Sequence, residues 1–270
     1  MDAASHNREP ESTTEAPARA CDCDRGYHRP VTQQDVRRGQ GADLSAVHVV
    51  VPLRGIESGK SRLGQALDAE EREALVLGLL GRTLDVLAAW PQAQRTYLVT
   101  GDAATADLAR RMQPTLIVLD EPHDGGLNAA LRTARDAAAA AGATAVLMLP
   151  ADLPLLDVAA LDRLLDGADA ALAAGKGHAL VVVAPADARG GTNALLVSPP
   201  NLVEPSFGES SLAAHLTAAA KADATVQLVI DPALGFDLDT PDDLERLSTD
   251  VVLELEHRGE QMLATQAAPH

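Results

Sequence analysis

Positively charged side chains follow the most valine-rich stretch near the start of this sequence. Residues 47–51 read VHVVV, a run of β-branched residues typical of a buried strand. The loop after them carries three basic residues and two glycines: Arg54, Lys60, Arg62, Gly55 and Gly59. A buried strand that feeds a glycine-containing basic loop is how many α/β proteins hold nucleotide phosphates. The segment 47–63 therefore predicts an anion site.

The loop residues 55–61, GIESGKS, are one residue short of a P-loop. A P-loop needs four residues between its glycines, whereas three separate Gly55 from Gly59. Because a P-loop surrounds phosphates with backbone N–H groups at fixed spacing, the missing residue disfavours a P-loop NTPase. A basic surface turn without a ligand is the remaining alternative.

Three aspartates are candidate metal ligands. Asp152 follows the apolar residues 144–149, which are typical of a central parallel strand, and ligands of α/β sheets bind beyond the carboxyl ends of such strands. A carboxylate there suits Mg²⁺, although Asp152 could instead cap the following turn. Asp237 and Asp239 alternate in an extended segment, so they can aim two carboxylates at one cation.

A second group of polar residues lies between 190 and 211. Gly190 and Gly191 allow a backbone to approach an anion closely, and Thr192 adds a hydroxyl. The segment 207–211, FGESS, opens a predicted helix, whose N-terminus favours anions. Ser211 could also be a helix-start hydroxyl with no ligand. The histidines show no metal-ligand spacing, so we expect them at the surface.

The elements that position these residues alternate between strand and helix. This alternation predicts an α/β fold with a mostly parallel sheet covered on both faces. We expect strands from about 46 and over 96–100, 115–119, 144–149, 179–184, 193–197 and 225–230. We expect helices to about Trp90, over 103–112, to about Ala141, through Leu165, to about Ala220 and after Thr240.

Composition excludes several classes of function. The net charge of −17 argues against binding to a nucleic-acid backbone, and no apolar run reaches the length of a membrane span. Cys21 and Cys23 do not have the spacing of a zinc site or a disulfide framework, and they fit a reducing cytoplasm. We expect a disordered leader at 1–44, a folded domain at 45–250 and a helical or frayed tail at 251–270.

Taken together, the motifs resemble those of the 2-phospho-L-lactate/phosphoenolpyruvate guanylyltransferase family of coenzyme F-420 biosynthesis. The resemblance covers about residues 46–248 and implies a Rossmann-like, GT-A-type nucleotidyltransferase fold. That fold is a three-layer sandwich with a mixed, mostly parallel central sheet. The matching segments are PLR at 52–54, GKSRL at 59–63, GLNAA at 126–130, PADLP at 150–154, GTNAL at 191–195, FG at 207–208 with Ser211, and DLDTP at 237–241.

The resemblance also implies a role for each candidate residue. Lys60, Arg54 and Asp152 would be catalytic, although Arg54 stands where many relatives have lysine. One or two Mg²⁺ ions would be held by Asp152, Asp237 and Asp239. The acceptor would be bound by Thr192, Gly208 and Ser211. The nucleotide would be bound by Pro52, Leu53, Arg54, Lys60, Arg62, Gly126 and Asn128.

The implied reaction transfers GMP from GTP to phosphoenolpyruvate or 2-phospho-L-lactate and releases pyrophosphate. The alternatives are a related nucleotidyltransferase that uses 3-phosphoglycerate, a sugar phosphate or molybdopterin, and a non-catalytic nucleotide-binding module. The expected partners are thus GTP and a small phosphorylated carboxylic acid, with neither nucleic acid nor membrane. Whether the chain forms a homodimer is left open.

Overall fold

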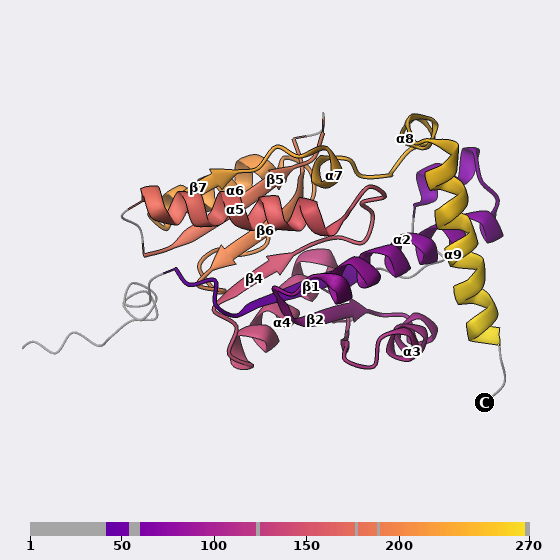
Figure 1. The fold of residues 1–270 in the computed structure, drawn as a ribbon, viewed down its shortest axis with the longest axis horizontal. Helices are drawn as coiled ribbons and strands as arrows, with labels where there is room; N and C mark the ends of the chain where they lie inside the picture. The colour runs from indigo at the N-terminus through magenta and orange to yellow at the C-terminus, as the bar shows by residue number, and fades with distance from the viewer. Residues whose placement is uncertain (1–41, 54–59, 123–124, 176–177, 188–189, 268–270) are drawn as a thin grey trace, which may run out of the picture.

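A computed structural model describes residues 42–53, 60–122, 125–175, 178–187 and 190–267, which are coloured in Figure 1. Arg54 and almost all of the expected leader lie outside these residues. The roles predicted for them therefore stay predictions.

In the part of the chain that the model describes, seven strands form one sheet in the order β3-β2-β1-β4-β6-β5-β7. β6 runs antiparallel to its neighbours β4 and β5, whereas the other paired strands are parallel. The mixed, mostly parallel sheet that we expected is thus confirmed. The strands are β1 (Val47–Leu53), β2 (Ala93–Thr100), β3 (Ile117–Asp120), β4 (Ala145–Met148), β5 (Leu180–Pro185), β6 (Thr192–Ser198) and β7 (Thr225–Leu228).

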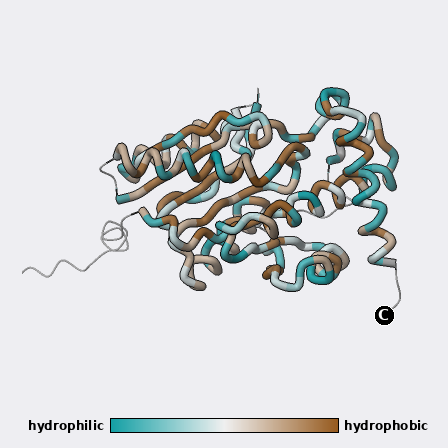
Figure 2. Tube along the Cα trace, in the orientation of Figure 1, coloured by the Kyte–Doolittle hydropathy of each residue, from teal (hydrophilic) through white to brown (hydrophobic). Residues whose placement is uncertain are grey.

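Helices cover both faces of the sheet and complete three layers (Figure 1). Because side chains alternate along a strand, Val49 of β1 packs on one helical layer and Val50 on the other. Hydrophobic residues accordingly follow the strands through the middle of the molecule (Figure 2). One layer holds α2 (Ala69–Ala89), α3 (Ala103–Met112) and α5 (Val158–Ala174), and the other holds α4 (Gly126–Ala140) and α6 (Ser211–Lys221).

Two helices differ from the sequence-based expectation. α5 continues beyond Leu165 to Ala174. Its Gly167 lies in mid-helix, where a Cβ would press against Val229, so this glycine permits close packing rather than ending the helix. The one-turn helix α7 (Pro232–Gly235) was not predicted, because four residues are too few to show a helical period.

The last helix, α9 (Thr249–Ala267), crosses α2 and packs against it (Figure 1). The two backbones come so close that a Cβ on Gly78 or Gly259 would overlap a carbonyl group of the other helix. Leu255 of α9 is buried in a cluster with Leu63 and Leu238. None of the helices within the described residues is long and apolar enough to cross a bilayer.

Candidate active site

Several predicted site residues come together at one edge of the sheet. Lys60 lies seven residues beyond the end of β1, and Asp152 lies four residues beyond β4. Because β6 is antiparallel to β4, with Leu195 beside Met148, its first residue Thr192 lies at this same edge. The carboxyl end of a parallel sheet is where α/β proteins bind ligands, as the sequence predicted.

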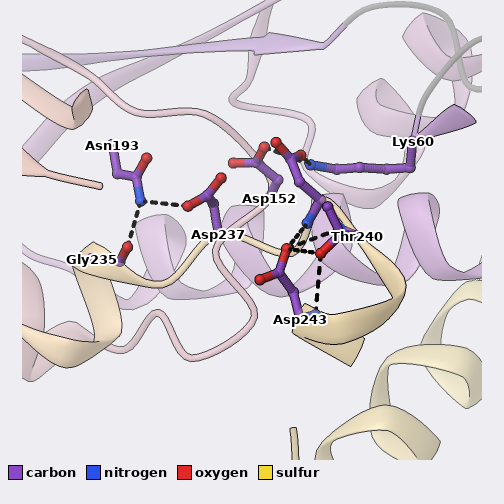
Figure 3. A network of polar contacts seen from close by, with 8 residues as sticks. Lys60, Asp152, Asn193, Gly235, Asp237, Thr240 and Asp243 are labelled. Carbon is purple, nitrogen blue, oxygen red and sulfur yellow. Dashed lines mark hydrogen bonds and ion pairs between the residues drawn. The ribbon is translucent and has the colours of Figure 1, made fainter. Parts of the chain in front are cut away.

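Lys60 is held between two of the candidate metal ligands. Its Nζ lies 2.7 Å from Oδ2 of Asp152 and 2.5 Å from Oδ1 of Asp239. Figure 3 shows the lysine side chain reaching toward Asp152. The backbone of Lys60 has φ 53° and ψ 38°, in the left-handed region, immediately before the 3₁₀ helix η2 (Ser61–Gln65). Lys60, whose ammonium group contacts both carboxylates, therefore adopts a backbone conformation that is uncommon for residues other than glycine.

Electrostatics keeps Lys60 charged. Burial on its own lowers the pKa of Lys60, but the carboxylates of Asp152 and Asp239 outweigh burial and raise the pKa above its ordinary value. Only 13% of the side-chain surface is exposed, so water screens these charges less than at the protein surface. The site thus holds the Lys60 ammonium group between the carboxylates of Asp152 and Asp239.

The segment 237–239 is fixed beside Asp152 by its backbone. The N–H of Leu238 donates to the carbonyl oxygen of Asp152 at 3.0 Å, and the Leu238 side chain is fully buried. The aspartates on either side of Leu238 therefore stay out of the core, as the alternation predicted. Asp239 contacts Lys60, whereas Asp237 Oδ1 lies 3.4 Å from Nδ2 of Asn193.

A capping box holds the end of this segment (Figure 3). Thr240 is the N-cap residue of α8 (Pro241–Arg246), and its Oγ1 accepts a hydrogen bond from the N–H of Asp243. The Asp243 carboxylate in turn accepts from the N–H groups of Asp239 and Thr240. Asp243 thus orients the backbone at Asp239.

The carboxylates fit a magnesium ion in part. Asp152 Oδ1 is buried and has no hydrogen-bond partner within the described ranges, so one carboxylate oxygen of Asp152 is left for a cation. Mg²⁺ is usually held by one or two carboxylates together with substrate phosphates, and Asp152 and Asp239 supply two. Among the described residues, however, no three acidic, histidine or cysteine side chains are arranged to hold a metal by themselves. The role of Asp237 as a third ligand therefore stays a prediction.

The predicted acceptor residues gather where β6 meets α6. Leu212 donates its backbone N–H to Gly190 O at 3.2 Å, which joins the start of α6 to the turn before β6. Ser211 is the first residue of α6, and its buried Oγ has no hydrogen-bond partner within the described ranges. Gly208 has φ 128° and open space at its Cβ position. A buried unpartnered hydroxyl at a helix N-terminus can donate to an anionic ligand.

Thr192 is part of this group and contacts a histidine. Its Oγ1 lies 3.0 Å from Nδ1 of His215, and both side chains are buried. Nε2 of His215 lies 3.0 Å from the backbone nitrogen of Ser206, which can only donate. Nδ1 of the neutral ring therefore carries the proton and cannot accept one from Thr192. This arrangement excludes Thr192 as a nucleophile activated by His215.

The residues predicted to bind the nucleotide are more dispersed. Pro52 and Leu53 end β1, and Arg62 is exposed on η2. Gly126, with φ 62°, begins α4. The side-chain amide of Asn128 makes two hydrogen bonds to the backbone of Phe207. Its Oδ1 accepts from the Phe207 N–H at 2.7 Å, and its Nδ2 donates to the Phe207 carbonyl oxygen at 3.0 Å. No nucleotide contact of these residues is tested by the structure, so their roles stay predictions.

The expectation that the histidines lie at the surface is wrong for His48 and His215. Their exposed fractions are 2% and 0%, respectively. His215 lies four residues after Ser211, so the two share one face of α6. That spacing is the signal in the sequence that could have linked His215 to the predicted acceptor residues.

Comparison with known proteins identifies the family. Residues 47–251 match the family model described as guanylyl transferase CofC like. A phosphoenolpyruvate guanylyltransferase of Rubrobacter xylanophilus is 40% identical over 202 residues, which cover 75% of this chain and 93% of that protein. A 3-phospho-D-glycerate guanylyltransferase of Colwellia psychrerythraea is 30% identical, over 74% of this chain and 90% of that protein.

Solved structures confirm the fold class. A protein of Desulfovibrio desulfuricans G20 assigned as a nucleotide-diphospho-sugar transferase superposes with a TM-score of 0.62 at 16% identity, over 82% of this chain and 97% of that one. CMP:2-keto-3-deoxy-manno-octonic acid synthetase, solved with CTP, gives a TM-score of 0.51 at 12% identity, over 79% and 100%. By the family match over residues 47–251 and the two guanylyltransferase relatives, the chain is a nucleotidyltransferase enzyme, and it belongs to the CofC-like guanylyl transferase family.

Proposed function

We propose that this enzyme transfers GMP from GTP to phosphoenolpyruvate, or to 2-phospho-L-lactate, and releases pyrophosphate. The acceptor is favoured by the relatives, since those of Rubrobacter xylanophilus and Sphaerobacter thermophilus, 40% and 36% identical, carry the name phosphoenolpyruvate guanylyltransferase. We also propose that the enzyme acts in coenzyme F-420 biosynthesis and in the cytoplasm.

The observation that carries the proposal is the position of Lys60 between Asp152 and Asp239. The Lys60 ammonium group can offset the charge of two anionic substrates, and the two carboxylates beside it can bind a divalent cation that does the same. Mg²⁺ would be held by Asp152 and Asp239, with Asp237 as a further candidate, and when bound it neutralises charge on the triphosphate. Lys60 would then contact phosphate oxygens.

In the proposed reaction, an oxygen of the acceptor's phosphate forms a bond to the α-phosphorus of GTP. The bond between that phosphorus and the oxygen bridging to the β-phosphorus breaks, and pyrophosphate leaves with the electron pair. Because the attacking phosphate is already ionised, no side chain has to remove a proton. The protein contributes alignment and charge stabilisation, and this agrees with a Thr192–His215 pair that cannot act as nucleophile and base.

The acceptor half fits a small molecule with several anionic oxygens. The start of α6, with the buried Ser211 hydroxyl, lies beside the turn at Gly190 and Gly191, and the buried Thr192 hydroxyl follows this turn at the start of β6. Hydroxyls and helix N-termini donate hydrogen bonds to carboxylate and phosphate oxygens.

An acceptor screen tests the proposal. The chain is incubated with GTP and Mg²⁺ and with phosphoenolpyruvate, 2-phospho-L-lactate or 3-phosphoglycerate, and products are identified by mass. We expect a guanylylated phosphoenolpyruvate or phospholactate and a stoichiometric amount of pyrophosphate. Failure to form an adduct with any phosphorylated acid would contradict the proposal, and GTP hydrolysis without an acceptor would favour an NTPase.

3-Phosphoglycerate is the second candidate acceptor, because the Colwellia psychrerythraea relative carries that name. The three acids share a carboxylate and a phosphate and differ in few other atoms. Relative kcat/KM values from the same screen decide between them.

A further inference from the structure

His215 is a buried side chain that the proposed reaction does not use, yet both of its ring nitrogens are engaged. Nε2 accepts from the N–H of Ser206, so the proton of the neutral ring is on Nδ1 and is donated to Oγ1 of Thr192. Burial lowers the pKa of His215 to about 4, so the ring is neutral near neutral pH. The His215 ring also makes an edge-to-face contact with the ring of Phe207, with 5.1 Å between the ring centroids, and this contact further fixes the plane of the imidazole.

This tautomer determines what Thr192 can offer to a ligand. A threonine hydroxyl has one proton and two lone pairs. One lone pair of Thr192 Oγ1 accepts from His215, and Oγ1 has no other hydrogen-bond partner among the residues described. The hydroxyl proton is thus left for an acceptor atom such as a carboxylate or phosphate oxygen.

His215 also fixes the loop that leads into α6. Its bond to Ser206 holds one side of this loop, and Asn128 holds the N–H and carbonyl groups of Phe207 from the side of α4. Gly208 follows directly, with its positive φ and open surroundings. Ser211, one helical turn before His215, lies on the same face of α6.

We propose that His215 is a positioning residue of the acceptor site, which presents the Thr192 hydroxyl as a donor to an anionic oxygen and fixes the backbone of residues 206–208 beside it. The inference rests on the proposed function, because the acceptor acid is the ligand to which the hydroxyl donates. Because Thr192 Oγ1 already accepts from His215 and keeps its proton to donate, the site should favour ligands with anionic oxygens over ligands that donate hydrogen bonds at this position.

Two substitutions separate the two contacts. His215→Asn places an amide near the position of Nδ1 and can still donate to Thr192. His215→Gln places its amide near the position of Nε2 and can still accept from Ser206. We expect His215→Gln to raise the KM of the acceptor about tenfold, as for loss of one hydrogen bond to a charged group, with the KM of GTP changed less than about twofold. His215→Asn should recover most of the acceptor KM.

Thr192→Val provides the coupling test. If His215 acts through the Thr192 hydroxyl, His215→Gln adds little to the acceptor KM once Thr192 is valine. Independent effects of the two substitutions, or equal losses for both substrates in both His215 variants, would contradict the proposal and indicate a general role in packing.

The tautomer is measured directly by ¹⁵N NMR on the unliganded wild-type chain. A proton on Nδ1 of His215 is expected, and a proton on Nε2 would overturn the proposal. This measurement needs no turnover, so it tests the role of His215 separately from the proposed guanylyl transfer. If no phosphorylated acid is guanylylated, the proposed function fails, whereas the His215 geometry is still decided by the spectrum.

Discussion

At the scale of single residues, Lys60 brings together side chains that are far apart in the sequence. Its ammonium contacts Asp152, 92 residues away, and Asp239, 179 residues away. Without Lys60 the two carboxylates would repel each other in a partly buried place. In the proposed reaction, Mg²⁺ would bind these two carboxylates and Lys60 would contact the phosphates of the nucleotide.

Neutralising either carboxylate should remove catalysis without unfolding the chain. We expect Asp152→Asn and Asp239→Asn to lower kcat for guanylyl transfer by about 100-fold or more, because metal-ion stabilisation of phosphoryl transfer is worth several kcal/mol. Rates are measured by pyrophosphate release, and folding is checked by thermal unfolding. Asp242→Asn is the matched control, since Asp242 is an exposed acid in the first turn of α8. Near-wild-type rates in both site variants would remove the metal assignment.

The stability of the chain should depend on pH through His215. Its pKa of about 4 in the folded chain lies below the ordinary value of 6.5, so the unfolded chain binds more protons between these values. Stability from this group is therefore present above pH 6.5 and is lost as the pH falls toward 4. Between about pH 7 and about pH 4.5, wild type should lose about 2 to 3 kcal/mol more unfolding free energy than His215→Asn. Urea unfolding measures this difference, and equal losses would contradict the neutral buried ring.

At the scale of elements, α9 supports the segments that carry the charged site. Its Leu255 is buried with Leu63, three residues after Lys60, and with Leu238, between Asp237 and Asp239. The family match ends at residue 251, so nearly all of α9 lies beyond it. Through Leu255, α9 thus packs against residues next to Lys60, Asp237 and Asp239 although most of the helix lies beyond the family region.

A pair of leucines tests this support. Leu255 is 0% exposed and Leu253 is 56% exposed on the same helix. We expect Leu255→Ala to lower the free energy of unfolding by about 3 kcal/mol, as for other buried leucines, and also to lower kcat. Leu253→Ala should change stability by less than about 0.5 kcal/mol and leave the rate unchanged. Similar effects of the two substitutions on both measurements would show that α9 does not support the site.

Several elements were predictable from sequence for a clear physical reason. β1 and β4 are nearly continuous apolar runs because both of their faces are covered by helices. The capping boxes at Asp68 with Glu71 and at Thr240 with Asp243 mark helix starts by local residue types alone. Asp152 could be placed at the ligand-binding edge because it follows the carboxyl end of β4, whereas the outward direction of Asp237 and Asp239 follows from their alternation around Leu238.

Other features depend on tertiary contacts that no local pattern records. The antiparallel direction of β6 follows from its pairing with β4 and β5, and it brings Thr192 to the site. The burial of His215 depends on the loop at Ser206 folding over α6. The salt bridge from Lys60 to two aspartates also joins segments whose approach is set by the whole fold.

At the scale of the whole molecule, the net negative charge and the Lys60 cation affect different kinds of partner. A net charge of −17 disfavours nucleic acid as a partner, whereas small anions need only a local charge such as Lys60. The sheet edge places this charge beside the carboxylates, and Asn193 connects them with the start of β6 through Asp237 and Gly235 (Figure 3). Asn193 thus links the segment that carries Asp237 to the start of β6, next to Thr192.

The central claim is that an oxygen of the acceptor's phosphate attacks the α-phosphorus of GTP. It is tested most directly by supplying phosphoenolpyruvate with its non-bridging phosphate oxygens labelled with ¹⁸O, together with unlabelled GTP and Mg²⁺, and weighing both products. The account predicts that every labelled oxygen is retained in the guanylylated acid and that pyrophosphate is unlabelled. Formation of GDP, of labelled pyrophosphate, or of GMP with no adduct would contradict it.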